Sequence, residues 1–583
     1  MAIKGIDREA LAKRIEQREK EGDIKPKECE GNKDIVPKIQ SKIIKNRFRV
    51  DENGVWEIKD GKNQKFISKY MEIKSIRKNI DTGKYSAILA YKSFFEIQEI
   101  EIDREVYLNK NKLLELINLG VDVRHDNVAK LVEYFRVYEE IIKKISNVHS
   151  ELGFAKYNNK YIYKLYKAIG VESQYVGNYK IEPKGSKEEY KKMLREEVQG
   201  RCELEFVTAT SLSALVLGYI GERVGVDSSI VHLVGNSTTG KSTALKLGIS
   251  LFANPDSKVN GLFGTYNGTN NALLKKLNGL KGVPYALDEI SMSYTQNFTN
   301  FVYGLANGTD KERLNKDSEL KKKGVWLTTI LSNGEKSLIG SSNKNAGVQI
   351  RVIEASNVTW TRDAENAEKI NRVIQQNYGH IGFEFAEYIM KRKKDQLVKQ
   401  FEISRDEIYK KMEDELVIDS MTFRRCNKFG IILQTAYLFQ DMMDINLDID
   451  GIKSLMVEIE RESLRNRNFR DSAIDYIKQY VSKYINKFQF NNNSPNDIFG
   501  KLIPKQDCVE VQMNKISFEQ MINQGGYEDK NVVLKELKDA GYLNCEKDRY
   551  TRSRKNSFGC SEEVYVIKLP KEETKEMIEE EVV

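Results

Sequence analysis

The stretch that decides the fold is "SSIVHLVGNSTTGKSTALKLG", residues 228–248. Its centre, "GNSTTGKS", has the glycine, lysine and serine spacing of a phosphate-binding loop. The apolar run "IVHLV" before it predicts a strand, and "STALKLGISLFA" after it predicts a helix. In such a loop, backbone N–H groups surround phosphates at a helix N-terminus, where the helix dipole adds positive potential. The sequence therefore predicts a nucleotide site in an α/β core.

Each residue type in this loop has a chemical role in binding phosphate or magnesium. Gly235 and Gly240 let the backbone turn tightly against phosphates, Lys241 is expected to reach the β- and γ-phosphates, and the Ser242 hydroxyl is expected to bind Mg²⁺. The predicted nucleotide-binding residues are Gly235, Asn236, Ser237, Thr238, Thr239, Gly240, Lys241, Ser242 and Thr243.

A second apolar run, "GVPYALDEIS" (282–291), ends in two adjacent acids. Asp288 follows Lys241 by 288 − 241 = 47 residues. We expect Asp288 to hold Mg²⁺ through water and Glu289 to polarise the attacking water. A pair of acids is what hydrolysis requires, whereas one acid would suffice for binding.

Two later runs supply further polar candidates. "GVWLTTILSNGE" (324–335) ends in Ser332-Asn333, where additional-strand ATPases carry sensor 1, a residue that contacts the γ-phosphate or the lytic water. Asn333 is the preferred candidate and Ser332 the alternative. In "NAGVQIRVIEAS" (345–356), Arg351 stands alone among apolar residues. Its partner is either a neighbouring subunit's nucleotide or an intramolecular carboxylate.

Composition indicates a cytoplasmic globular protein. The 583 residues suggest roughly three or four domains. Lys and Arg exceed Asp and Glu by 94 − 86 = 8, which permits nucleic-acid binding without requiring it. The six cysteines form no CxxC pair and have no nearby His, which argues against zinc fingers and a disulfide framework. The apolar run at 206–221 is too short to span a bilayer and predicts a buried helix.

The patterning predicts five segments: a charged helical lead segment (1–45), an α+β domain (46–195), an ATPase core (196–360), a helical lid and connector (361–487), and a winged helix with an acidic tail (488–583). In the last segment, "ISFEQMINQ" and "KNVVLKELKDAGYL" flank Gly525-Gly526 and precede a hairpin with a basic tip. Helix, turn, helix and basic hairpin are typical of a winged helix, although a small α+β packing domain would also fit.

The chain resembles the MCM-like AAA+ helicases of staphylococcal mobile elements. The segments that carry the resemblance are "VGNSTTGKST", "NGTNNALLKKL" with "LDEIS", "LANGTDKERL" and "LSNGE". The resemblance implies a multidomain α/β fold with a central AAA+ P-loop ATPase, a helical lid and a C-terminal winged helix. It also implies a hexameric, ATP-driven ring that acts on single-stranded and forked DNA with the replication partners of a mobile element, away from membranes. No zinc ribbon of the archaeal and eukaryotic MCM kind occurs in the first 190 residues.

The resemblance also assigns residue roles. Lys241 and Ser242 match Walker A, and Asp288 and Glu289 match Walker B. Implied catalytic residues are Lys241, Glu289, Asn333 as sensor 1, Arg351 as the arginine finger, and Arg424 as the sensor 2 arginine, with Arg425 as the alternative.

The segment "NGTDKERLNKDSELKKKG" (307–324) predicts a hairpin, which in MCM-like rings projects into the central channel. The DNA-contact candidates are Lys311, Arg313, Lys316, Lys321, Lys322 and Lys323. Four acids interleave with them, so a solvated surface hairpin is the alternative. The aromatic pair Phe263 and Tyr266 belongs either to a second channel loop or to the core.

Two other functions fit the same motifs. One is an ATP-dependent initiator or remodeller that binds and melts an origin without processive unwinding. The other is a nucleotide-gated scaffold, although the retained Glu289 argues against a pure switch.

Overall fold

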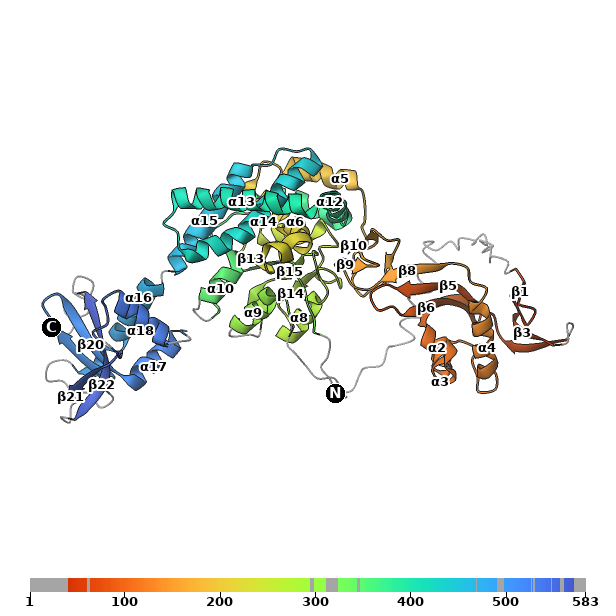
Figure 1. The fold of residues 1–583 in the computed structure, drawn as a ribbon, viewed down its shortest axis with the longest axis horizontal. Helices are drawn as coiled ribbons and strands as arrows, with labels where there is room; N and C mark the ends of the chain where they lie inside the picture. The colour runs from red at the N-terminus through yellow and green to blue at the C-terminus, as the bar shows by residue number, and fades with distance from the viewer. Residues whose placement is uncertain are drawn as a thin grey trace, which may run out of the picture. The chain divides into compact units, whose positions relative to one another are not determined.

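The computed structural model describes most of the chain and divides it into two units (Figure 1). The described residues are 40–59, 63–293, 298–310, 323–342, 346–467, 469–489, 498–525, 527, 530–546, 548–555 and 560–570. The first unit comprises the chain up to Lys78 and Lys84–Ser146, and the second comprises Asn79–Gly83 and the chain from Asn147 onward. Most of the predicted lead segment, and the acidic tail from 571, lie outside the described residues.

The first unit consists of antiparallel strands and short helices. One sheet contains β1 (Lys42–Ile44), β2 (Phe48–Asp51), β3 (Gly54–Lys59) and β4 (Asn63–Ser68). A second set of antiparallel strands contains β5 (Met71–Asn79), β6 (Tyr85–Ser93) and β7 (Glu96–Asp103). The helices are α2 (Arg104–Leu108), α3 (Lys110–Leu114), η1 (Glu115–Leu119) and α4 (Val128–Glu139). This part of the predicted α+β domain therefore contains both strands and helices.

Residues 147–195, grouped with the N-terminal domain from the sequence, pack instead into the core of the second unit. They form β8 (Ile145–His149), β9 (Gly153–Tyr157), β10 (Lys160–Lys164), β11 (Ala168–Ile169), β12 (Gln174–Tyr175), α5 (Lys187–Met193) and the π-helix η2 (Leu194–Val198). Phe154 and Tyr163 are buried in the same cluster as the parallel sheet, and the Phe154 N–H donates to Lys281 O at 2.7 Å. These apolar side chains are therefore buried with the α/β core, on the other side of the boundary proposed at 195 from the sequence.

A five-stranded parallel sheet forms the centre of the second unit. Its strands are, in spatial order, β14 (Phe263–Thr265), β15 (Tyr285–Asp288), β16 (Thr329–Gly334), β13 (Ser229–Val234) and β17 (Val352–Ala355). Every adjacent pair is parallel. The strands are almost continuously buried, as expected for a parallel sheet covered on both faces. Helices that accompany the sheet are α7 (Lys241–Ser250), α8 (Asn270–Leu277), η3 (Ile290–Met292), α9 (Thr299–Asn307) and α10 (Ala346–Arg351).

Helix α6 (Cys202–Val224) joins the sheet to a helical region (Figure 1). It packs on α7 and β16 on one side and on α13, α14 and α15 on the other. The helical region contains α11 (Ala364–Gln376), α12 (Ile381–Met390), α13 (Lys394–Glu415), α14 (Ser420–Met443) and α15 (Ile449–Arg467). Among the described helices, α6 alone is long and apolar enough to cross a membrane, and its apolar window is wholly buried in the protein. The predicted buried helix is confirmed.

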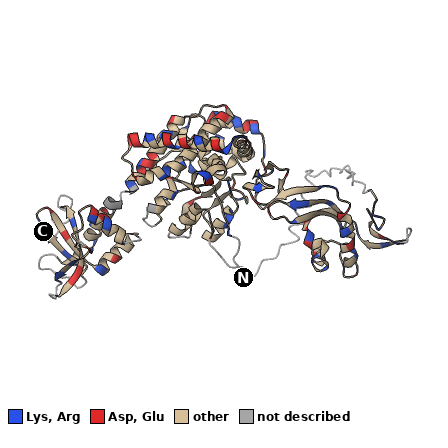
Figure 2. Ribbon diagram, viewed as in Figure 1, with Lys and Arg blue, Asp and Glu red and all other residues tan. Residues whose placement is uncertain are grey.

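Charged residues of both signs cover this helical region. Figure 2 shows Lys and Arg interspersed with Asp and Glu along the helices above the sheet. Many are i, i+3 or i, i+4 pairs, such as Lys411–Glu415 in α13. The pattern is typical of a solvated helical surface.

The C-terminal module has its own hydrophobic core. It contains α16 (Phe469–Lys483), η4 (Ile485–Lys487), β18 (Phe488–Gln489), β19 (Gly500–Pro504), β20 (Cys508–Asn514), α17 (Lys515–Gln524), α18 (Lys530–Asp539), β21 (Arg552–Lys555) and β22 (Ser561–Pro570). The predicted pair of helices and the antiparallel hairpin β21–β22 are present. Helix α16, which precedes the boundary proposed at 488, packs on α18 and contributes Ile477 and Tyr480 to this core.

Candidate nucleotide site

The phosphate-binding loop connects β13 to α7, as the sequence predicts. The strand ends at Val234 and the helix begins at Lys241. Asn236, Ser237 and Thr238 between them are exposed. The loop therefore opens to solvent at the carboxyl edge of the parallel sheet, where α/β folds bind ligands.

The segment that follows β17 supports the loop. Gly240 has φ +82°, and a Cβ there would lie 2.4 Å from Thr361 Oγ1 and 2.9 Å from Thr361 N, so only glycine fits. The Trp360 N–H donates to Thr239 O at 2.8 Å. In the first turn of α7, Thr243 Oγ1 accepts a hydrogen bond of 2.9 Å from Asn371 Nδ2 of α11. The helical region thus touches the nucleotide loop directly.

The side chain of Lys241 folds into the loop. Its Nζ donates to Gly235 O at 2.7 Å and to Asn236 O at 2.6 Å, and the residue is buried. An ammonium group at the centre of a helix N-terminal loop favours an anion there.

Four of the predicted residues are joined by hydrogen bonds at this edge of the sheet. The Ser242 hydroxyl donates to Asp288 Oδ1 at 3.3 Å and accepts from Asn333 Nδ2 at 3.2 Å. The Asn333 Oδ1 in turn accepts the backbone N–H of Glu289 at 2.8 Å. Three separate chain segments, the loop and the ends of β15 and β16, therefore bring their polar residues together.

The two candidates for sensor 1 point to opposite faces of β16. Ser332 is fully buried, and its Oγ shares hydrogen bonds with His232 Nδ1 at 2.8 Å and with Tyr266 OH at 2.6 Å. Asn333 faces the nucleotide loop instead. Only Asn333 lies where it can contact the loop, since successive strand residues face opposite sides.

The backbone of Glu289 is strained. Its φ is +60°, in the left-handed region that non-glycine residues rarely adopt. Its carboxylate accepts hydrogen bonds from the Ser291 hydroxyl at 2.6 Å and the Ser291 N–H at 3.3 Å. Thr238 in the loop also has a left-handed φ of +76°. Such strain costs about 1–3 kcal/mol per residue and is typical of functional sites.

The oxygen donors at this edge fit a magnesium–nucleotide complex. Ser242 offers a hydroxyl and Asp288 a carboxylate, the hard oxygen ligands that Mg²⁺ prefers beside phosphate oxygens. Lys241 and the loop amides would hold the phosphates. Among the described residues, no cluster of three or more His, Cys, Asp or Glu suited to a metal occurs, so these oxygen donors would hold Mg²⁺ together with the phosphates.

Arg351 lies at the opposite edge of the sheet from its own nucleotide loop. It ends α10 and directly precedes β17, which runs parallel to β13 with Val352 beside Ile230. Val234 follows Ser228, which precedes β13, by 234 − 228 = 6 residues, and six steps of a strand span about 20 Å. An arginine side chain does not cover that distance, so Arg351 does not reach the nucleotide loop of its own chain.

The guanidinium of Arg351 is held by uncharged groups. It stacks on Tyr303 with 4.4 Å to the ring centroid. It donates to Gly347 O at 2.9 Å and to Asn307 Oδ1 at 3.4 Å. Within the described part of the chain, no carboxylate forms an ion pair with it, so the intramolecular salt bridge considered as its alternative is not seen there.

The two adjacent arginines of α14 differ in environment. Arg424 is exposed, whereas Arg425 is fully buried and pairs with Glu460 of α15 at 2.5 Å. Arg425 Nη1 also donates to Gln349 O and Val352 O. These contacts place α14 beside the end of α10, so Arg424 also lies on the edge away from its own loop. Arg425 has a structural environment that sequence reasoning missed.

The predicted channel hairpin lies mostly outside the described residues, which exclude 311–322 and with them Lys311, Arg313, Lys316, Lys321 and Lys322. Its base is described: Thr309 pairs antiparallel with Val325, and the Asp310 N–H donates to Gly324 O at 2.9 Å. Phe263 and Tyr266 are buried, so a channel-facing role for these two aromatic residues is wrong and the core alternative holds.

Two residues near the site were not singled out from the sequence. Glu335 accepts a hydrogen bond from the Ser237 hydroxyl of the loop, and its place directly after "LSNG" is the only sequence signal. His232 of β13 is wholly buried behind Ser332, and burial lowers its pKa, which keeps it neutral. The apolar pattern of β13 does not reveal that His232 is the hydrogen-bond partner of Ser332 on the neighbouring strand.

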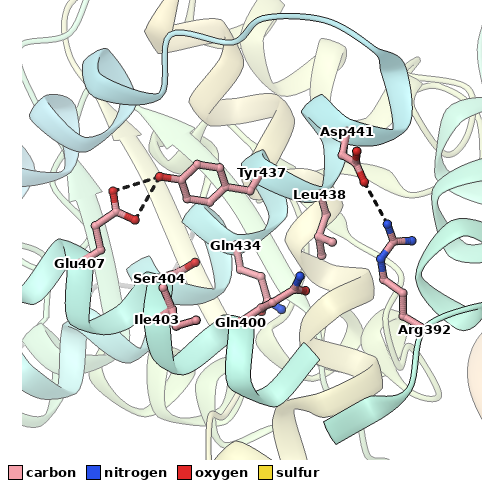
Figure 3. A pocket seen from close by; sticks show the side chains of 9 residues that line it. All are labelled: Arg392, Gln400, Ile403, Ser404, Glu407, Gln434, Tyr437, Leu438 and Asp441. Carbon is pink, nitrogen blue, oxygen red and sulfur yellow. Dashed lines mark hydrogen bonds and ion pairs between the residues drawn. The ribbon is translucent and has the colours of Figure 1, made fainter. Parts of the chain in front are cut away.

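A separate hollow of about 400 Å³ lies in the helical region between α13 and α14 (Figure 3). An Arg392–Asp441 ion pair of 3.0 Å lies at one end, and a Tyr437–Glu407 hydrogen bond of 3.0 Å lies at the other. None of the predicted site residues lines it.

Two protein families and a solved structure are similar to this chain, and together they cover most of its length. Residues 48–325 match a family described as a domain of unknown function, DUF927, and residues 469–572 match a Cch helix-turn-helix domain. No curated protein matches the sequence. A solved structure described as "SCCmec type IV Cch - active helicase" is similar with a TM-score of 0.73 and 23% identity, covering 91% of this chain and 98% of that one. The chain therefore shares the overall fold of that structure and carries a C-terminal helix-turn-helix domain.

Proposed function

We propose that the chain is an ATP-driven DNA helicase of the AAA+ class, MCM-like in organisation, that works as a hexameric ring in the cytoplasm. The observation that carries the proposal is the hydrogen-bonded group of Ser242, Asp288, Asn333 and Glu289 beside Lys241. It contains a nucleotide loop, a magnesium ligand pair and a second acid suited to activating water.

The order of the parallel strands supports this class. β16, which carries Asn333, lies between the loop strand β13 and the acidic strand β15. An additional strand in this place is the mark of the additional-strand ATPases, which include the AAA+ group.

The place of Arg351 supports the ring. Because it lies about 20 Å of strand away from its own loop, its charge is useful only at an interface between subunits. A closed ring of head-to-tail subunits repeats such an interface at every site. Arg424, exposed on α14 near the same edge, is proposed to contact the same neighbouring nucleotide.

Each residue of the site has a separate proposed role in ATP hydrolysis. Bound ATP and Mg²⁺ would supply the phosphoanhydride bond whose cleavage drives movement. Lys241 neutralises phosphate charge, and Asp288 and Ser242 provide the oxygen ligands. Glu289 orients the attacking water and accepts its proton, while Asn333 fixes the backbone of Glu289. Arg351 of one subunit stabilises charge that develops in its neighbour's site.

The DNA contacts are proposed from the sequence and from the neighbouring structure. The solved structure described as an active helicase shares the fold of this chain. The hairpin whose base is at Thr309 and Val325 would project Lys311, Arg313, Lys316, Lys321 and Lys322 toward single-stranded DNA in the channel. The C-terminal module, proposed to be a winged helix, would bind duplex DNA or replication partners of a mobile element.

ATP turnover with single-stranded DNA tests this proposal. Wild type is expected to turn over ATP repeatedly, and Glu289→Gln is expected to bind nucleotide but to lose hydrolysis. A Glu335→Gln variant, which changes an acid on the other side of the loop, serves as the matched control. If Glu289→Gln hydrolyses ATP as fast as wild type, the assignment of the catalytic acid is wrong.

An origin-binding initiator or remodeller is a second candidate, and the helix-turn-helix match at 469–572 favours it. It predicts sequence-specific duplex binding that requires the C-terminal module, with ATP hydrolysis but without fork unwinding. Loss of unwinding alone, in a protein that still hydrolyses ATP, would select it. A scaffold gated by nucleotide predicts no multiple turnover.

A further inference from the structure

The junction between α10 and β17, where Arg351 lies, is held by two buried hydrogen-bond donors of another helix, Arg425 and Lys428. Arg425 and Lys428 are three residues apart on α14, so they project from the same face. Both are buried, and both donate to backbone carbonyls at this junction.

Arg425 holds the carbonyls on either side of Arg351. Its Nη1 donates to Gln349 O at 2.6 Å and to Val352 O at 2.7 Å. Its Nε donates to Glu460 at 2.5 Å, and neither member of this pair is exposed. Thr422, one turn earlier on α14, donates to the other carboxylate oxygen of Glu460 at 2.8 Å.

Lys428 holds the carbonyl of Arg351 itself. Its Nζ donates to Arg351 O at 2.9 Å and to Ser228 O at 3.1 Å. Ser228 directly precedes β13, the strand that ends at the nucleotide loop. One side chain therefore ties the backbone of Arg351 to the start of the loop strand and to the helical region.

The carbonyls at the end of a helix have no partner within the helix, and cations there are favoured. Ordinary caps use water or exposed side chains, whereas this junction uses the buried side chains of an arginine and a lysine. A buried ion pair such as Arg425–Glu460 contributes little net stability, and the best-attested reason to retain one is to fix a single geometry.

We propose that Arg425 and Lys428 are positioning residues that hold Arg351 for action in the neighbouring subunit's nucleotide site. The inference rests on the proposed function, since it requires Arg351 to act between subunits. It makes α14 the element through which the helical region, which also reaches the loop at Asn371–Thr243, sets the position of Arg351.

The test uses the full-length chain with Lys428→Met, which keeps an unbranched side chain one atom shorter and removes both hydrogen bonds. Lys453→Met is the matched control, because Lys453 is a lysine of the same helical region whose ion pairs, among the described residues, are with Glu407 and Asp450. We expect Lys428→Met to lower the kcat of DNA-stimulated ATP hydrolysis about 10-fold or more with KM nearly unchanged, since the lost interaction acts in the transition state. Lys453→Met is expected to behave as wild type.

A mixing experiment separates positioning from misfolding. Rings assembled from Lys428→Met and Glu289→Gln subunits contain interfaces that pair an intact catalytic acid with an intact, correctly held Arg351. Activity of the mixture above the sum of its parts is expected. Absence of recovery would overturn the positioning role, because a misfolded or internally defective subunit is not rescued in this way.

Two further variants keep the outcomes distinct. Arg351→Ala mixed with Glu289→Gln tests the proposed function alone: without recovery there, Arg351 does not act between subunits. If that mixture recovers but Lys428→Met alone keeps wild-type activity, the positioning inference is wrong and the proposed function stands. Should Lys428→Met fail to fold, Arg425→Lys preserves the pairing with Glu460 but loses the paired carbonyl contacts, and the same kcat-selective loss is expected.

Discussion

Replacing Asn333 by Ala removes the residue that connects the three parts of the nucleotide site. The change deletes the acceptor of the Glu289 N–H, at 2.8 Å, and the donor to Ser242, at 3.2 Å. We expect the folded protein to bind nucleotide and to lose most of its hydrolysis, because Lys241 and the loop keep their contacts while Glu289 loses its support.

The size of the effect follows from the backbone of Glu289. A φ of +60° stores about 1–3 kcal/mol, and the hydrogen bond to Asn333 that opposes its release is worth about 1 kcal/mol. Without that bond Glu289 relaxes, and regaining the productive geometry costs the stored strain, about 2 kcal/mol. At 1.36 kcal/mol per factor of ten, kcat is expected to fall about 30-fold.

The neighbouring Ser332→Ala variant is the control. Ser332 lies on the same strand but bonds to His232 and Tyr266 on the other face. Its loss should cost about 1–3 kcal/mol of stability, through two buried groups left without a partner, and leave kcat near wild type. The assays are steady-state ATP hydrolysis, nucleotide binding and chemical denaturation. The reasoning is refuted if Asn333→Ala keeps kcat within about threefold of wild type, or if Ser332→Ala loses as much activity.

Two other predictions concern charge. Burial lowers the pKa of Lys428 to about 7, where Arg425, Asp227 and Arg351 are the charged groups that face it. Between that pH and about 10.4, the unfolded chain binds more protons than the folded one. The free energy of unfolding of wild type, relative to that of Lys428→Met, should therefore rise with pH by up to about 1.4 kcal/mol per pH unit. Chemical denaturation of both proteins from pH 7 to 9 measures this difference, and a difference that does not change with pH would contradict the prediction. Lys316→Ala should retain ATP hydrolysis and lose fork unwinding, and retained unwinding would mean that the hairpin tip does not contact DNA.

The nucleotide loop and the acidic strand were predictable because both are local patterns. Gly240 and Lys241 are fixed by a loop of eight residues, and Asp288 by the end of one apolar strand. Parallel topology then brings both to one edge of the sheet, which is a general property of such folds. The structure was needed to choose Asn333 over Ser332. Successive strand residues face opposite sides of the sheet, and the sequence alone does not tell which of the two faces the nucleotide loop.

The contacts that could not be predicted join residues far apart in the sequence. Arg425 reads as a charge on an amphipathic helix, and only the packing of α14 against α10 and α15 brings Gln349 and Glu460 to it. The packing of two segments beside the proposed domain boundaries could not be predicted for a similar reason. Residues near 154 and 477 have ordinary apolar patterns. Which domain they belong to depends on which hydrophobic core buries them, and the pattern does not show that.

Unwinding of forked DNA with ATP tests the central claim most directly, when wild type is compared with Glu289→Gln on the same substrate. The account predicts strand separation by wild type that requires ATP, with none by Glu289→Gln although that variant still binds nucleotide. A fork that stays intact while wild type hydrolyses ATP would contradict the helicase and leave the initiator or remodeller in its place.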